Sequence, residues 1–331
     1  MTAAAATPLA LRALLAALLV VASAGCGVTR GEDTRDLLMI IPNAPGGGYD
    51  QTGREAAKVM EDAGITGGSF TVDNVEGAGG TNAFTEMLGD AGDEHTVMTV
   101  GLGVVGSLYS FGNDARLGDA TPLAQLISEP EGVLVPGDSP FRTIDDLADA
   151  WRADPSGIAV GGGSSPGGPD HLFPMQLADT LGIDAREVNY VSYDGGGPLT
   201  SALLGAKIDV GFSGLAEFTQ QIADGELRVL AVSGEDRQPQ PELADVPTLV
   251  ESDIDLVFLN WRGILAPPDI SDERREELIG YLEKMHETEA WREQLEAYGW
   301  TDDFKTGEEF EEFLAEQDER VSSTLEGLGL L

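Results

Sequence analysis

The chain has 331 residues, of which 42% are hydrophobic, and its 58 aspartates and glutamates outnumber its 19 lysines and arginines, giving a formal net charge of −39. This charge argues against nucleic acid or an anionic lipid surface as a partner, because both would repel the protein. The acidic residues are dispersed along the sequence, which indicates a hydrated acidic surface of the kind found in proteins that work in high salt. The length is sufficient for two domains.

The N-terminus predicts a secretory signal that ends in a lipid anchor. Arg12 precedes an apolar run over residues 13–22, and small residues follow it up to Cys26. The run is too short for a convincing membrane span. Cys26 is the single cysteine of the sequence, so it cannot form a disulfide within the chain.

The letters "SAGC" at this point resemble the bacterial lipobox, which implies lipidation of Cys26; the alternative is a signal peptide whose cysteine is incidental. We therefore expect a signal peptide over residues 1–25 and a lipid-anchor linker over residues 26–36. The mature protein would be extracytoplasmic, held on the outer side of the cell membrane as a lipoprotein.

Strand and helix patterns alternate from residue 37 onward. The predicted strands are Leu37–Ile41, Ser69–Asn74, Thr96–Val100, Leu123–Ile127, Gly132–Val135, Ile158–Gly161, Glu187–Val191, Val210–Phe212 and Arg228–Val232. The predicted helices are Thr52–Ala63, Thr81–Leu88, Ile144–Ala153, His171–Leu181, Leu199–Leu204, Ala216–Ala223, Asp272–Glu287 and Glu308–Leu325. Strands separated by single helices predict an α/β fold with parallel sheets and helices on both faces.

A fresh strand–helix series begins soon after residue 128, and a polar, proline-rich passage follows near 232–248. This order predicts a second domain, residues 129–239, inserted into a first domain formed by residues 37–128 and 240–331. Two such α/β domains joined by double crossovers would form a hinged pair with a cleft between them.

Many of the 43 glycines gather in turns between predicted strands and helices. Four such turns stand out, at Gly46–Gly48, Gly79–Gly80, Ser164–Gly167 and Gly195–Gly196. Backbone N–H groups near a helix N-terminus bind anions, and ligands of open α/β sheets bind beyond the carboxyl ends of the strands. The turns therefore predict an anion site built from backbone donors. A nucleoside triphosphate is disfavoured, because the first turn lacks the Lys-Ser/Thr pair of a P-loop.

Two other motifs formally match enzyme or nucleotide signatures. "GLGVVG", residues 101–106, satisfies the dinucleotide pattern, but Asp119, the nearest acidic residue at a suitable distance, lies in a loop before the next strand. We therefore interpret the motif as a glycine-rich turn of an α/β sheet. "GSSPG", residues 163–167, has the pattern of a hydrolase nucleophile elbow with Ser165 as nucleophile. Pro166 cannot supply the N–H that the oxyanion hole of that motif needs. An exported serine hydrolase is therefore the weaker alternative function.

Six stretches resemble, in order and spacing, the substrate-binding proteins of tripartite tricarboxylate transporters, the Bug-type receptors. They are "IPNAPGGGYDQTGRE", "DNVEGAGGTNAFTEML", "GGGSSPGGPDHL", "VNYVSYDGGGPLTSALLGAKIDVGFSG", "VPTLVES" and "FLNWRGILAPPDIS". The resemblance implies a two-lobed periplasmic-binding-protein-like fold of type II, each lobe a mainly parallel sheet flanked by helices, with the ligand cleft between the lobes. It implies a receptor, not an enzyme, that captures a small organic acid and delivers it to membrane permease subunits. We expect no cofactor and no metal, and a monomer.

The resemblance also implies where the ligand binds. The carboxylate would be held by the first strand–helix loop and by the "GSSPGG" loop, and Tyr193-Asp194-Gly195-Gly196 of the second lobe would close against them. The predicted ligand-binding residues are Pro45, Gly46, Gly47, Gly48, Tyr49, Asp50, Gly79, Gly80, Thr81, Ser164, Ser165, Gly167, His171, Tyr193, Gly195, Gly196 and Ser213.

Four side chains near these loops have competing interpretations. Asp50 precedes Arg54 by four residues, so we interpret it mainly as an N-cap with an i,i+4 ion pair, because a bare carboxylate would repel a bound one. Tyr49 could donate its hydroxyl to the cleft or cover the lobe surface. Trp261 is expected to pack at the return between domains, and Arg262 is the best-placed cation for a ligand carboxylate.

Overall fold

The computed structural model describes residues 36–193 and 195–331. The predicted signal peptide, Cys26, the linker up to residue 35 and Asp194 lie outside the described residues. The segment Arg35–Leu331 is one compact unit. None of the helices in the described part is long and apolar enough to cross a membrane.

The described strands form a mixed sheet in the order β2-β1-β3-β9-β4-β7-β5-β6, and β8 and β10 also pair with β4. The bounds are β1 (Leu37–Ile41), β2 (Phe70–Asn74), β3 (Thr96–Gly101), β4 (Thr121–Pro136), β5 (Ala159–Gly162), β6 (Asn189–Ser192), β7 (Val210–Gly214), β8 (Leu227–Val232), β9 (Leu259–Ala266) and β10 (Thr301–Thr306). The outer strands are parallel, as β2-β1-β3 at one end and β7-β5-β6 at the other.

The long strand β4 joins the two parallel groups and pairs antiparallel with β7, β8, β9 and β10. The two strands predicted at Leu123–Ile127 and Gly132–Val135 are therefore one strand of 16 residues. We expected mainly parallel sheets, and this is corrected to a mixed sheet. Strands β9 and β4 lie between the two parallel groups, and they pair antiparallel with each other and with β3 and β7. The expected α/β class is confirmed. The predicted boundary at residue 128 falls inside β4, and the division into lobes stays a prediction.

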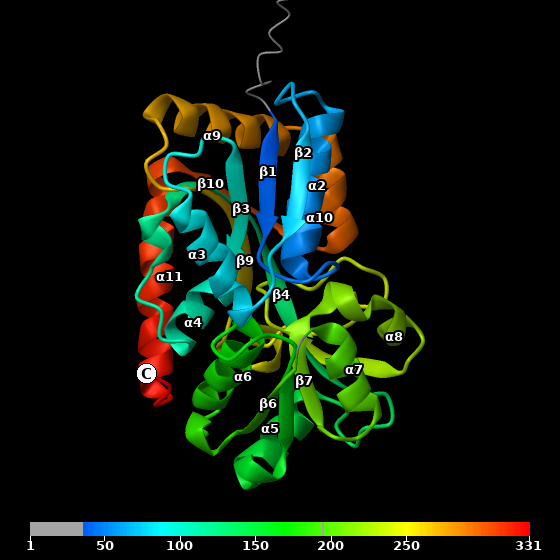
Figure 1. Ribbon diagram of the computed structural model, residues 1–331. Coiled ribbons are helices and arrows are strands. Elements are labelled where there is room, and N and C mark those ends of the chain that lie inside the picture. Colours follow the sequence, from blue (N-terminus) through cyan, green and yellow to red (C-terminus); the bar gives the residue numbers. More distant parts are fainter. Residues whose placement is uncertain (1–35, 194) are drawn as a thin grey trace, which may run out of the picture. The chain divides into compact units, whose positions relative to one another are not determined.

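The helices cover both faces of the sheet, with α9, α10 and α11 around the β1–β3 end and α5 to α8 around β5–β7 (Figure 1). Their bounds are α2 (Gly48–Asp62), α3 (Thr81–Gly89), α4 (Leu102–Ser110), α5 (Ile144–Ala153), α6 (Pro169–Thr180), α7 (Gly196–Leu204), α8 (Thr219–Ala223), α9 (Asp272–His286), α10 (Glu289–Tyr298) and α11 (Gly307–Gly327). Short 3-10 turns are η1 (Ala78–Gly80), η2 (Leu117–Asp119), η3 (Pro155–Gly157), η4 (Ala185–Glu187), η5 (Leu215–Phe218) and η6 (Val250–Ser252).

Helix α9 shows how local sequence sets an element. The Ser271 hydroxyl accepts the Arg274 N–H at 3.2 Å, and this cap satisfies one of the first free donors of the helix. Leu278, Leu282 and Met285 recur at helical spacing and are all buried. The helix predicted at Asp272–Glu287 is confirmed, and it ends one residue earlier, at His286.

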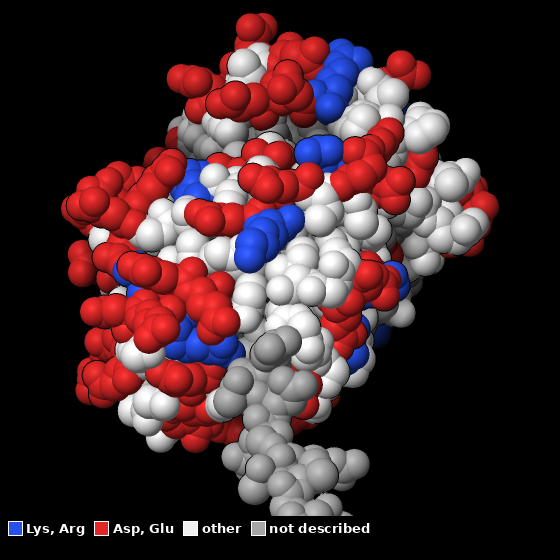
Figure 2. Space-filling model, turned by 90° about the horizontal axis from the view of Figure 1, so that it is seen from above, with Lys and Arg blue, Asp and Glu red and all other residues white. Residues whose placement is uncertain are grey.

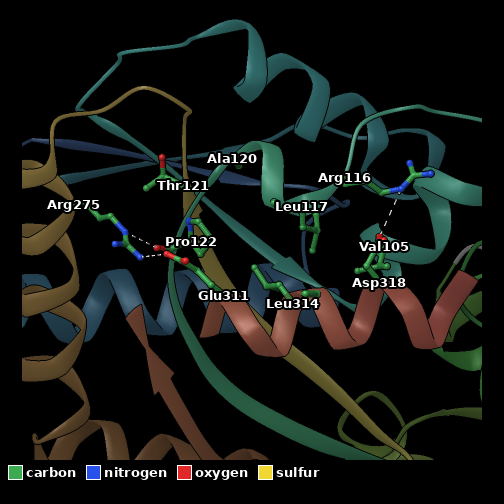
Figure 3. A pocket seen from close by; sticks show the side chains of 12 residues that line it. Val105, Arg116, Leu117, Ala120, Thr121, Pro122, Arg275, Glu311, Leu314 and Asp318 are labelled. Atoms are coloured by element: carbon green, nitrogen blue, oxygen red, sulfur yellow. Dashed lines mark hydrogen bonds and ion pairs between the residues drawn. The ribbon is translucent and has the colours of Figure 1, made fainter. Parts of the chain in front are cut away.

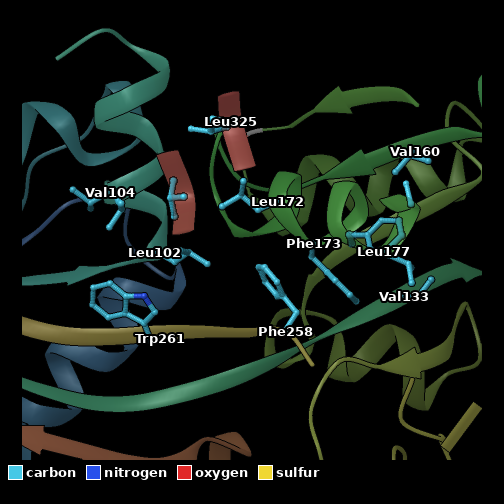
Figure 4. Packing of buried hydrophobic residues seen from close by; sticks show 14 of the residues in the cluster. Leu102, Val104, Val133, Val160, Leu172, Phe173, Leu177, Phe258, Trp261 and Leu325 are labelled. Carbon is cyan, nitrogen blue, oxygen red and sulfur yellow. The ribbon is translucent and has the colours of Figure 1, made fainter. Parts of the chain in front are cut away.

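A continuous hydrophobic core runs from one group of strands to the other (Figure 4). It includes Leu102 and Trp261 at one end and Val133 and Val160 at the other. Trp261 is 2% exposed and packs edge-on against Phe313 at 5.3 Å between ring centroids. Its predicted packing role is confirmed.

Acidic side chains cover much of the surface seen from above, and lysines and arginines form only scattered patches there (Figure 2). This arrangement follows from 58 acidic and 19 basic residues in the sequence. Many of the basic residues are also paired; Lys58, for example, lies 2.6 Å from Asp62. The surface field is therefore strongly negative.

Candidate functional site

The first glycine turn is held in place by Asp50. Helix α2 begins at Gly48 with Gly47 as the N-cap residue, so Asp50 is in the first turn and is not the N-cap that we predicted. Its carboxylate reaches back to accept the Gly46 N–H at 2.9 Å, and it also accepts from Arg54 at 2.7 Å and from Asn74 at 2.9 Å. Burial acts against ionisation, but these hydrogen bonds outweigh it and hold the pKa of Asp50 below its ordinary value. The predicted ion pair with Arg54 is confirmed.

The N–H groups at the start of α2 remain for other partners. The first helical N–H groups have no acceptor inside their own helix, and they carry the positive end of the helix dipole. Beside them lies Arg262, since a methyl group on Gly48 would overlap its guanidinium. A cation next to a positive helix end is unfavourable unless negative charge lies close by, and this arrangement is suited to an anion.

Part of that negative charge is Glu129. Its carboxylate lies 2.5 Å from Arg262, and the two side chains are 8% and 7% exposed. The pairing is possible because β9 lies between β3 and β4, with Arg262 opposite Gly101 on one side and Ile127 on the other. Arg262 was predicted as the best-placed cation; the structure places it at the first turn, already paired.

Tyr49 connects the first turn to helix α4. Its hydroxyl oxygen accepts the Val104 N–H of α4 at 3.2 Å, and its half-buried ring lies 6.0 Å from the Arg262 guanidinium. Burial raises the pKa of Tyr49 to about 12, although Arg262 opposes the shift. The phenol therefore stays protonated, with its own proton available for donation.

The four glycine turns contact one another in sequence. A methyl group on Gly80 would touch Pro42 at 3.0 Å, just before the first turn, and one on Gly79 would touch Ser165 at 3.0 Å. Gly195 donates its N–H to the Gly163 carbonyl at 2.8 Å, which links the third turn to the fourth. The turns that the sequence predicted as a site are therefore assembled in one place.

The GSSPGG loop is organised around α6 rather than around a nucleophile. Ser164 accepts the Asp170 N–H at 3.1 Å, and His171 accepts the Gly167 N–H on Nδ1 at 3.0 Å. The His171 proton must then be on Nε2. The ring stacks on Tyr190 at 4.4 Å, and burial lowers the pKa of His171 to about 4, so it is neutral. Ser165 contributes its carbonyl to the loop as acceptor of the Gly168 N–H.

The motif "GLGVVG" is not a turn, because Leu102–Ser110 forms helix α4. Its glycines permit close approach: a methyl group on Gly106 would overlap the Gly167 carbonyl, and one on Gly103 would touch Tyr49. The pattern therefore serves packing between α4 and the GSSPGG loop.

Two more of the turns hold carboxylates of the protein itself. Asp170 accepts the Gly163 N–H at 2.7 Å, and Glu217 in η5 accepts the Gly196 N–H at 3.0 Å at the start of α7. With Asp50 on Gly46, three of the four turns already bind an internal carboxylate. A ligand could therefore bind the N–H groups of Gly46, Gly163 and Gly196 only by displacing the carboxylates that already accept from them.

A group of acidic side chains lies under the turns. Burial raises the pKa of Asp170 to about 7, with Ser213 and Gly163 opposing through hydrogen bonds. Glu131 is fully buried, and burial together with its neighbour Asp170 raises its pKa well above the ordinary value. The negative charge of Asp170 adds to the effect of burial on Glu131, because two like charges close together disfavour ionisation.

Glu217 is at the open side of this group. It is exposed to solvent, yet the main cause that raises its pKa is burial by surrounding protein.

The remaining predicted residues have three kinds of placement. Thr81 and Ser213 are buried beside the turns, while Pro45 is exposed at the tip of the first loop. Tyr193 packs its ring on Gly161 and donates its N–H to the Gly162 carbonyl, so it supports the loop. The binding roles of all these residues stay a prediction.

The acidic group was missed in the sequence. Glu129, Glu131, Asp170 and Glu217 were not predicted as site residues. One signal was available: "SEPEG" interrupts the apolar run between Leu123 and Val135 with two acidic residues. Buried charges inside a strand are rare unless they are paired.

A pocket of about 560 Å³ lies elsewhere, beside α9 and α11 (Figure 3). Its two arginines are already paired with carboxylates of α11, Arg275 with Glu311 and Arg116 with Asp318. Its lining includes none of the predicted ligand-binding residues. We therefore assign the candidate site to the turns. Within residues 36–193 and 195–331, no group of three or more His, Cys, Asp or Glu side chains is arranged to hold a metal ion.

Comparison with known proteins agrees with this fold. The BugT protein of Bordetella pertussis is 25% identical over 322 residues, which cover 93% of this chain and 95% of BugT. The solved structure of MatC from Rhodopseudomonas palustris with bound malate has a TM-score of 0.73 at 21% identity, and the match covers 88% of this chain and 99% of MatC. Rpa4515 of R. palustris with adipate has a TM-score of 0.75 at 19% identity, covering 89% and 97%.

These structures confirm the periplasmic-binding-protein type of fold. The family model of the tripartite tricarboxylate transporter family receptor matches residues 54–330, which is most of the sequence. The resemblance noted in the sequence is thereby confirmed, and the chain belongs to this family of solute-binding receptors.

Proposed function

We propose that this receptor works outside the cytoplasm, where it captures a small carboxylate and delivers it to the membrane permease subunits of a tripartite transporter. Family membership supports the receptor role. The malate and adipate bound to two proteins of the same fold support an organic acid as the ligand class.

One observation carries the carboxylate. The Arg262 guanidinium lies against Gly48, where the first N–H groups of α2 have no acceptor in their own helix. A ligand carboxylate placed there accepts from the α2 backbone, from Arg262 and from the Tyr49 hydroxyl. Charge-assisted hydrogen bonds of this kind are about twice as strong as neutral ones.

Binding in this scheme needs no covalent chemistry. Closure of the turns around the ligand excludes water, and the lower local dielectric strengthens each hydrogen bond to the carboxylate. Selectivity follows from which donors and acceptors the closed turns present. The competing hydrolase hypothesis needs Ser165 activated by His171, but the His171 Nδ1 already accepts the Gly167 N–H.

Anchoring and assembly complete the proposal. Lipidation of Cys26 would hold the receptor at the membrane beside its permease, and a monomer suffices for capture. Metabolic labelling with a fatty acid, compared with a Cys26→Ala variant, tests the anchor directly; label retained by the variant would exclude Cys26 as the attachment site.

A thermal-shift screen with mono-, di- and tricarboxylates tests the function. A binding acid should raise the melting temperature by mass action. Gly48→Ala should abolish that shift, because the added methyl group displaces Arg262. Gly280→Ala in α9 is the control, since a methyl group there meets open space and should leave binding unchanged.

Two results would count against the proposal. Failure of every acid to raise the melting temperature would remove the receptor function. Esterase activity that disappears in Ser165→Ala would favour the hydrolase.

A further inference from the structure

The occupied turns restrict which ligand the site can accept. Asp50, Asp170 and Glu217 each fill one backbone donor site with a carboxylate of the protein. A ligand with several carboxylates would have to displace these groups or lie against them. One carboxylate can be accommodated without displacement, at the start of α2 beside Arg262.

Two unsatisfied hydroxyl groups add donors next to that place. Ser107 is 1% exposed and Thr81 is 7% exposed, and neither hydroxyl has a hydrogen-bond partner among the described residues. Ser107 is directed at the Gly79 turn, because a methyl group on Gly79 would overlap its hydroxyl. Buried polar groups are rarely left unpaired, so these donors indicate a bound polar group.

The opposite side of the site offers an acceptor. Glu217 is exposed to solvent, and the Gly196 N–H bonds only one of its two oxygens, Oε2. Glu217 is in η5, and an added methyl group on Gly214, the N-cap residue of η5, would overlap the Glu129 carboxylate that pairs with Arg262. This contact places η5 beside the proposed carboxylate position. A second ligand carboxylate here would face Glu217, and like charges repel.

We propose that the ligand carries a protonated amine as well as a carboxylate, and that Glu217 accepts a hydrogen bond from this amine while α2 and Arg262 hold the carboxylate. This inference rests on the proposed function. It assigns the receptor to small amino acids rather than to di- or tricarboxylates. Each charge of a zwitterion then lies opposite a charge of the site, the carboxylate at Arg262 and the amine at Glu217.

Isothermal titration with matched pairs tests the inference on the wild-type protein. The pairs are alanine with propionate, aspartate with succinate, and glutamate with glutarate; malate and adipate serve as reference acids. We expect an amine-bearing member to bind at least about tenfold more tightly than its partner, as a charge-assisted hydrogen bond implies.

Glu217→Gln should remove that advantage while retaining the fold, because a glutamine oxygen can still accept the Gly196 N–H. Glu226→Gln is the matched control, an exposed glutamate of the same region whose loss should leave the advantage intact.

The outcomes separate the two proposals. Malate, adipate, succinate or glutarate binding as tightly as the amino acids would overturn the amine inference and leave the carboxylate receptor standing. Tighter binding of all acids by the Glu217→Gln variant would also overturn the amine inference. That result would mean that Glu217 repels ligand carboxylates at the N-terminus of α7 and does not accept a hydrogen bond from an amine. No binding of any acid would overturn the proposed function itself.

Discussion

Replacing Arg262 with methionine tests whether the Arg262–Glu129 pair holds the centre of the site together. The two side chains are 7% and 8% exposed and lie 2.5 Å apart, so neither charge has water as an alternative partner. Removing one member of a buried pair leaves an uncompensated charge and costs about 3–5 kcal/mol. We expect Arg262→Met to lower the free energy of unfolding of the ligand-free protein by that amount. Urea denaturation followed by tryptophan fluorescence and circular dichroism measures it, with coincident transitions as the two-state check.

A matched control and a double variant complete this experiment. Arg292 pairs with Glu289 on the surface, where the side chains are 59% and 76% exposed, so Arg292→Met should cost no more than about 1 kcal/mol. Arg262→Met combined with Glu129→Met should recover most of the loss, because a buried ion pair replaced by apolar groups is often neutral. Equal costs for Arg262→Met and Arg292→Met, or additive costs in the double variant, would refute a coupled buried pair.

Three further predictions concern charge. Burial raises the pKa of Asp170 from 3.8 to about 7, so this group should lower wild-type stability by up to about 4 kcal/mol as pH rises from about 4 through about 7. Asp170→Asn should reduce the fall in stability by that amount; identical pH profiles would contradict the prediction. Hydrogen bonds lower the pKa of Asp50, so Asp50→Asn should cost about 1–3 kcal/mol at neutral pH and the cost should shrink as pH falls below about 4; a cost independent of pH would oppose this account. The net charge of −39 predicts a melting temperature that rises from about 0.1 M to 1 M KCl as the Debye length falls from about 10 to 3 Å; a constant or falling value would show that surface repulsion is unimportant.

Much of the fold was predictable because hydrophobic periodicity and turn-forming residues are local features of the sequence. Strand Leu37–Ile41 was predicted with its observed bounds, as was helix Ile144–Ala153. Helix α4 was missed, since its glycines favour turns in isolation and only contact with Gly167 explains them. Strand β9 was missed because polar Asn260 and Arg262 interrupt its apolar pattern, and their partners on β4 are far away in the sequence.

The candidate site was predictable as a set of loops but not as a set of charges. Glycine turns after strands point to one edge of a sheet, and the structure brings the four turns into contact. Which N–H groups stay free depends on side chains that arrive from elsewhere. Glu217 is 21 residues from Gly196, so no local pattern indicates that its carboxylate occupies that turn.

The surface charge and the internal carboxylates favour the same class of ligand. An anion approaching a protein with a net charge of −39 is repelled, and the repulsion reaches about 8 Å at physiological ionic strength. The repulsion grows with the charge of the ligand, so a tricarboxylate is hindered most. A zwitterion has no net charge and approaches freely, and inside the site its carboxylate faces Arg262 while its amine faces Glu217. High salt would screen the repulsion between the protein surface and an approaching ligand, but it would hardly weaken the buried Arg262–Glu129 pair. Binding of the ligand inside the site therefore does not depend on the electrostatic field of the protein surface.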